Sequence, residues 1–153
     1  MAKIWATSRS RLGAAAIASG FLLACSTNAQ PGGDRRNASM NLNEKELSSM
    51  LQTVIDAPAL QPYYHSEQQG RIPLTVVAQL PGKVDLRKFG QPVLVTSEGE
   101  PGKAVLEFTQ IQQDAAGCTV EFRYTVEGIR GKFDLSRDAD GRWVIRKHEL
   151  HEN

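Results

Sequence analysis

The last residues of the chain carry the residue types of a metal site. "HELHE", residues 148–152, contains two histidines and two glutamates, and zinc proteases use two histidines four apart on a helix with a glutamate between them. Here His148 and His151 are three apart, and they continue the β-rich run "RWVIRK". Residues an odd number apart on a strand face opposite ways. The two imidazoles should therefore diverge, and we expect no metal site here.

A neighbouring acidic segment, "RDADGRW" at 137–143, resembles part of a calcium-binding loop. With Gly141 in the glycine position, the first ligand would be Ser136 and the closing glutamate would be Lys147. This set does not match the ligands of such a loop. We interpret "DADG" as a hairpin turn, in which Asp and Gly tolerate positive φ.

Two loops contain candidate binding residues. "QPYYHSEQQG", 61–70, places Tyr63, Tyr64 and His65 in a polar segment next to a proline. Tyrosine is favoured at protein interfaces because it combines a large rigid ring with a polar tip. The alternative is that one tyrosine covers the edge of the core and the other is incidental.

The second loop is "EGIRGKF", which puts Glu127 and Arg130 in a glycine-bracketed turn. A charged pair at a loop tip can orient a ligand carboxylate, and a plain hairpin turn is the alternative. The sequence contains no nucleophile elbow, phosphate-binding loop or dinucleotide fingerprint. We therefore predict no catalytic residue, no cofactor and no metal.

The first 24 residues have the order of a secretory signal peptide. Basic residues precede an apolar stretch at 12–23, and a small residue then precedes Cys25. As a helix the stretch would measure about 18 Å, well short of the roughly 30 Å hydrocarbon core of a bilayer. A transmembrane anchor is therefore not expected.

"LLAC", residues 22–25, resembles the lipobox of bacterial lipoprotein precursors, which signal peptidase II cleaves. In that family the cysteine thiol takes a diacylglycerol, the chain is cut before it, and the new amine is acylated. The resemblance implies that Cys25 is lipidated and that the protein is held in the cell envelope. Ser26 replaces the aspartate typical of inner-membrane retention, so in a host with two membranes it favours the outer membrane, facing the periplasm. The match assigns no family to the globular part.

Cys118 is the second of two cysteines. If Cys25 carries a lipid, Cys118 has no disulfide partner even in an oxidising compartment. It begins an alternating apolar run, "CTVEFRY". We therefore expect a small, buried core residue.

The pattern predicts a lipidated cysteine and flexible tether at 25–41, rich in Ser, Asn, Gly and Pro. A single α+β domain follows at 42–153. Asn43 and Glu46 form a capping box in front of an apolar stripe that ends before Pro58. Alternating runs then predict five or six strands. Because no crossover helix intervenes, we expect a helix packed on a curved antiparallel sheet, similar in outline to cystatin-like and NTF2-like domains.

Charge and composition narrow the possible partners. Without residues 1–24 the chain has 15 Lys and Arg against 17 Asp and Glu, a formal charge of −2. Nucleic acid is therefore not expected, because its binding relies on clustered cations.

The leading hypothesis is a membrane-anchored, non-catalytic interaction module for an envelope or secreted protein. One alternative is a periplasmic carrier of a small apolar ligand, and another is an enzyme. The carrier would bind its ligand through four apolar residues: Leu106, Phe108, Phe122 and Tyr124.

Overall fold

The computed structural model describes residues 41–99 and 104–152. The chain divides into two units, Met1–Gly33 and Asp34–Asn153, and every described residue lies in the second. The predicted signal peptide, Cys25 and the tether up to residue 40 lie outside the described residues, so they stay predictions. Within the described part, no helix is long and apolar enough to cross a membrane.

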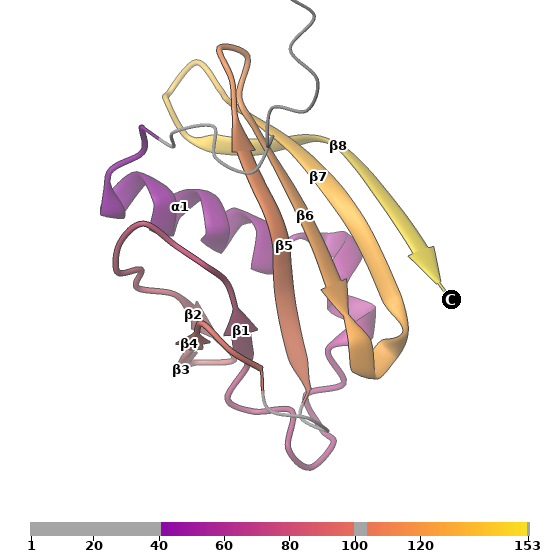
Figure 1. Ribbon diagram of the computed structural model, residues 1–153. Coiled ribbons are helices and arrows are strands. Elements are labelled where there is room, and N and C mark those ends of the chain that lie inside the picture. The colour runs from indigo at the N-terminus through magenta and orange to yellow at the C-terminus, as the bar shows by residue number, and fades with distance from the viewer. Residues whose placement is uncertain (1–40, 100–103, 153) are drawn as a thin grey trace, which may run out of the picture. The chain divides into compact units, whose positions relative to one another are not determined.

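The helix α1 (Glu44–Ile55) begins where the sequence predicts it. Asn43 Oδ1 accepts a hydrogen bond from Glu46 N at 3.0 Å, and Glu46 Oε2 accepts one from Asn43 N at 3.2 Å. This reciprocal capping satisfies two backbone donors at the helix start. The apolar stripe is buried against the sheet, and α1 crosses one face of the strands (Figure 1). Its buried residues are Leu47, Met50, Leu51, Val54 and Ile55.

The remaining elements of the described residues are two 3-10 helices and eight strands. The 3-10 helices are η1 (Pro58–Tyr63) and η2 (Thr125–Glu127). Two strands, β2 (Arg87–Lys88) and β3 (Gln91–Pro92), form a separate hairpin. The other six form one sheet in the order β4-β1-β5-β6-β7-β8. These are β1 (Thr75–Val77), β4 (Leu94–Thr96), β5 (Val105–Gln113), β6 (Cys118–Tyr124), β7 (Ile129–Arg137) and β8 (Trp143–Glu152).

The sheet is mixed, so the prediction of an antiparallel sheet is wrong for one side of it. Strands β5 to β8 form the expected antiparallel meander, but β1 pairs in parallel with both β4 and β5. Parallel neighbours require the chain to return to the same end of the sheet. Strands β1 and β4 have three residues each, so they are only about 10 Å long. Because they are so short, the segment 78–93 between them can return to the same end of the sheet without a helix. The α+β class holds.

The core lies between α1 and one face of the meander. In β6, Cys118, Val120, Phe122 and Tyr124 are buried, while the residues between them lie on the opposite, wet face. The rings of Phe122 and Phe133 stack with their centroids 5.3 Å apart. The four apolar residues of the carrier hypothesis belong to the same core as the buried residues of α1, and none is more than 6% exposed. Protein side chains therefore cover the face that this carrier would use.

Candidate functional site

Arg130 lies on the wet face of the meander and is separate from Glu127. Strand β7 begins at Ile129, so Arg130 is already a strand residue, opposite Arg123 of β6 and His151 of β8. Glu127 instead forms an ion pair with Arg71. The prediction that Glu127 and Arg130 share a turn as a charged pair is therefore wrong, because the turn is shorter than the sequence pattern indicated.

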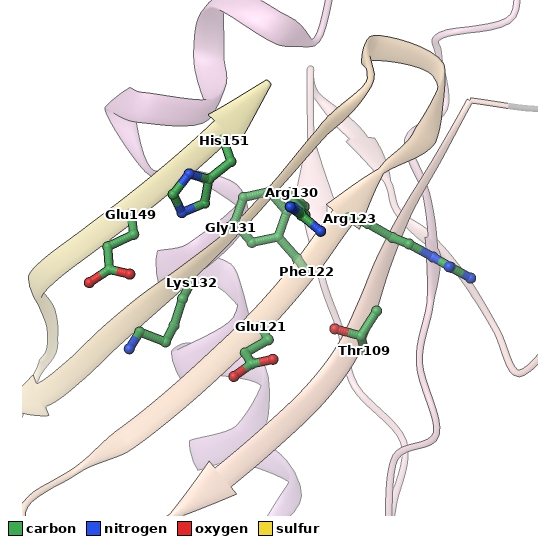
Figure 2. Close-up of a pocket in the computed structure, with 9 residues that line it drawn as sticks. All are labelled: Thr109, Glu121, Phe122, Arg123, Arg130, Gly131, Lys132, Glu149 and His151. Carbon is green, nitrogen blue, oxygen red and sulfur yellow. The ribbon is translucent and has the colours of Figure 1, made fainter. Parts of the chain in front are cut away.

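The wet face contains a depression of about 360 Å³ around Arg130. Figure 2 shows charged side chains from three adjacent strands projecting over it. The charged and basic residues that line it are Glu121, Arg123, Arg130, Lys132, Glu149 and His151. Sequence reasoning identified only Arg130 among these, because the alternation of each strand predicts a wet face but says nothing about which strands are neighbours.

Charges of both signs alternate over this face, but they do not all pair. Arg123 Nε contacts Glu107 Oε2 at 2.5 Å. Lys147 Nζ contacts Glu149 Oε1 at 2.6 Å, and this hydrogen bond lowers the pKa of Glu149. Within residues 41–99 and 104–152, no hydrogen bond or ion pair engages the side chain of Arg130, whereas Lys132 lies opposite Glu149 and its charge helps to lower the pKa of that carboxyl. The depression therefore contains one guanidinium, that of Arg130, that no described residue neutralises.

A second polar cluster joins His65 to Glu127, two of the predicted binding residues. Glu127 Oε1 lies 2.5 Å from Arg71 Nη2, and Glu127 Oε2 lies 3.4 Å from His65 Nε2. Arg71 also donates to the Tyr124 hydroxyl at 3.2 Å, and its side chain is only 10% exposed. The charged groups of this cluster are paired with one another. These contacts hold the segment after η1 against the turn before β7. Sequence reasoning missed Arg71, since nothing local marks a loop arginine as buried.

Tyr63 and Tyr64 have different environments. Tyr64 is 2% exposed, and its hydroxyl donates to the backbone oxygen of Ile55 at 2.8 Å. The prediction that Tyr64 offers contact area is wrong, because its ring fills the core at the end of α1, and this burial raises its pKa. Tyr63 is half-buried, and its hydroxyl contacts Glu152 Oε1 at 2.7 Å. Of the two, only Tyr63 reaches the surface.

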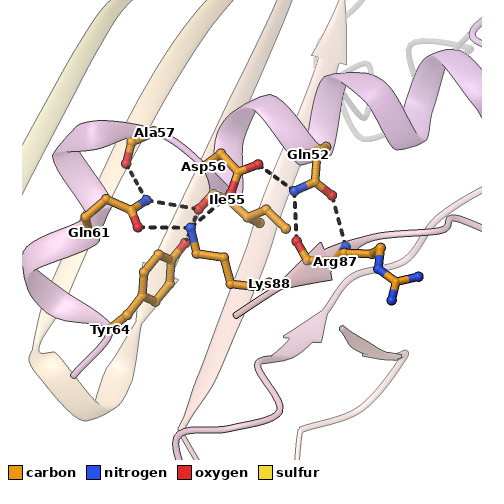
Figure 3. Close-up of polar contacts among 8 residues, drawn as sticks. All are labelled: Gln52, Ile55, Asp56, Ala57, Gln61, Tyr64, Arg87 and Lys88. Atoms are coloured by element: carbon orange, nitrogen blue, oxygen red, sulfur yellow. Dashed lines mark hydrogen bonds and ion pairs between the residues drawn. The ribbon is translucent and has the colours of Figure 1, made fainter. Parts of the chain in front are cut away.

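Lys88 is the one charged residue that is buried among those the structure describes. Its Nζ contacts Asp56 Oδ1 at 2.9 Å and Gln61 Oε1 at 3.0 Å, and it lies 4.9 Å from the centre of the Tyr64 ring (Figure 3). The last turn of α1 has no basic residue of its own. Lys88 therefore supplies a cation at the negative end of the helix dipole, and it fixes the β2–β3 hairpin to α1.

The two histidines near the C-terminus diverge, as their spacing predicts. His148 lies opposite Phe133, and the two ring centroids are 6.1 Å apart. His151 lies opposite Arg130 on the wet face. In the described residues no three His, Cys, Asp or Glu side chains gather as metal ligands.

Cys118 should resist alkylation in the folded protein. It is 3% exposed, and burial raises the pKa of its thiol to about 11. Because the thiolate is the nucleophile, only about one thiol in a thousand should be reactive at pH 8. Iodoacetamide labelling, followed by intact mass spectrometry, should be slow in buffer and fast in guanidinium chloride. Labelling in buffer at the rate of a free cysteine would show that the thiol is accessible.

Comparison with known proteins gives the chain no relatives. No protein-family model, no curated protein and no solved structure matches it. What the protein does must therefore be inferred from its own residues, and the depression around Arg130 is the strongest candidate site.

Proposed function

We propose that the protein is a lipid-anchored bacterial envelope protein whose α+β domain binds another envelope or secreted protein without catalysing a reaction. The observation that supports binding is the wet face of β5 to β8. It carries a depression of about 360 Å³, and Arg130 projects there without a hydrogen-bond or ion-pair partner in the described part of the chain. Local arrangements that do not favour the fold are expected at functional sites.

The N-terminal residues support the anchor. A basic start, an apolar stretch and "LLAC" occur in the order of a lipoprotein precursor. Each buried CH₂ contributes about 0.8 kcal/mol, so one acyl chain holds only marginally whereas two or three hold firmly. The tether predicted at 25–41 would have its ends on the order of 20 Å apart. A domain on such a tether can meet partners near the membrane surface. In a host with two membranes, Ser26 favours the outer membrane.

Site-specific photo-cross-linking in the protein's own cells tests the binding surface. A photoreactive phenylalanine analogue replaces Thr109, an exposed uncharged residue at the edge of the depression. Ser49, exposed and uncharged on α1, is the matched control. We expect one protein adduct from position 109 and none from position 49. Equal adducts from both positions, or none from position 109, would contradict the proposed surface.

Cys25→Ser is the test of the anchor in the same experiment. This variant should move from the membrane fraction to the soluble fraction of the envelope, and its adduct should weaken because the domain is no longer concentrated at the membrane. Intact mass spectrometry of the unmodified protein should show acyl chains on Cys25. A mature protein whose Cys25 carries no acyl chain would count against lipid anchoring.

A further inference from the structure

Three basic residues lie side by side across the wet face. The strand register pairs Arg123 of β6 with Arg130 of β7, and Arg130 with His151 of β8. Neighbouring strands are 4.7–4.9 Å apart, so this row spans roughly 10 Å. Figure 2 shows the three side chains on the same face. Arg123 and Arg130 carry like charges directly opposite each other, which destabilises a sheet, so the fold alone gives no reason for this pair.

Arg130, at the centre of the row, is the residue with spare hydrogen-bonding capacity. Arg123 is already engaged by Glu107 at 2.5 Å. The nearby carboxylate of Glu149 is engaged by Lys147 at 2.6 Å and lies opposite Lys132. A guanidinium has five N–H donors in a fixed fork, and no residue of the described chain accepts from that of Arg130. The row therefore presents an unsatisfied fork between two further basic groups.

We propose that the row Arg123–Arg130–His151 binds the carboxylates of an acidic, extended segment of the partner protein, an inference that rests on the proposed function. The arginine fork matches a carboxylate bidentately. Side chains on one side of an extended segment recur every two residues, about 6.7 Å apart. Two acidic residues at i and i+2 therefore fit within the roughly 10 Å of the row.

The acidic neighbours of the row define which anion it accepts. Glu107 lies directly opposite Arg123. Glu121 is two residues from Arg123 along β6, and Glu149 is two residues from His151 along β8. They repel a segment in which every residue is acidic, and they repel a doubly charged phosphate more than a singly charged carboxylate. The favoured segment consequently alternates acidic and neutral residues.

Fluorescence anisotropy of a labelled peptide tests this inference on the full-length protein in neutral detergent micelles. The probe is an eight-residue peptide that alternates Thr and Glu, and its control replaces every Glu with Gln. We expect the Glu peptide to bind, salt to weaken it, and Arg130→Gln to weaken it at least about tenfold, because hydrogen bonds to charged groups are strong. Arg87→Gln is the matched control, an exposed arginine of β2 far from this face.

Three results would overturn the inference: equal affinity of the unmodified and Arg130→Gln proteins, equal binding of the Gln peptide, or displacement of the Glu peptide by millimolar inorganic phosphate. An unchanged thermal melt of Arg130→Gln shows that its fold is intact. The outcome is separable from that of the proposed function. If the Thr109 adduct persists undiminished in Arg130→Gln, the acidic segment is wrong and the interaction module stands. If no adduct forms in the unmodified protein, the module itself is wrong.

Discussion

Replacing Phe133 with alanine should lower the free energy of unfolding by about 3–5 kcal/mol. Phe133 is fully buried in the middle of β7. Its ring stacks on that of Phe122, with the centroids 5.3 Å apart and the planes 15° apart. Truncation removes this contact and leaves a cavity that the two long strands on either side cannot close by collapsing. Against the 5–15 kcal/mol typical of a domain, this loss would leave much of the protein unfolded.

Urea denaturation of the full-length protein, followed by circular dichroism, measures this loss. Phe133→Leu is the matched control, because it keeps most of the volume and should cost less than about 1.5 kcal/mol. A loss below about 1 kcal/mol for the alanine variant would place Phe133 outside the tightly packed core.

Lys88→Ala should cost about 2–3 kcal/mol, an unusual effect for a lysine. The substitution removes two hydrogen bonds from a charged donor, to Asp56 and Gln61. It also removes the cation at the end of α1 and the contact with the Tyr64 ring, 4.9 Å from Nζ. Because Gln52 still binds both backbone groups of Arg87, we expect the hairpin to loosen rather than detach.

Two variants separate the contributions of Lys88. Lys88→Met retains the apolar stem and loses the charge and the two hydrogen bonds of Nζ. It should therefore destabilise the protein less than Lys88→Ala, because the stem stays buried. Arg87→Ala changes the neighbouring residue, whose side chain is exposed, and should be within about 0.5 kcal/mol of the unmodified protein. Equal unfolding midpoints for Lys88→Ala and Arg87→Ala in urea would show that the buried lysine does not hold the hairpin.

Features that depend on neighbours in the chain are predictable from the sequence. The capping box of α1 joins residues three apart, and its apolar stripe follows the helical period. The alternation in β6 separates core residues from wet ones and buries Cys118. The turn at 138–141 forms as expected, with Gly141 at φ 78° and Asp138 Oδ1 accepting from Asp140 N. In each case the pattern and the interaction lie within a few residues of each other.

The candidate site required the tertiary structure, because its residues come from separate strands. Arg123, Arg130 and His151 become neighbours through the register of three strands. That register depends on where β7 begins, and the sequence pattern placed Arg130 in the turn instead. Without knowledge of the register, the sequence gives no indication that these three basic residues, which lie in three separate strands, are neighbours.

The sequence by itself therefore determined the α+β class, the helix, the wet and dry faces of the long strands and the resemblance of residues 22–25 to a lipobox. The tertiary structure alone decided the parallel pairing of β1, the burial of Tyr64 and the bond between Arg71 and Glu127. The physical reason is distance along the chain. Local periodicity and capping arise from adjacent residues, whereas strand neighbours and ion pairs such as Arg71–Glu127 depend on how distant segments pack together.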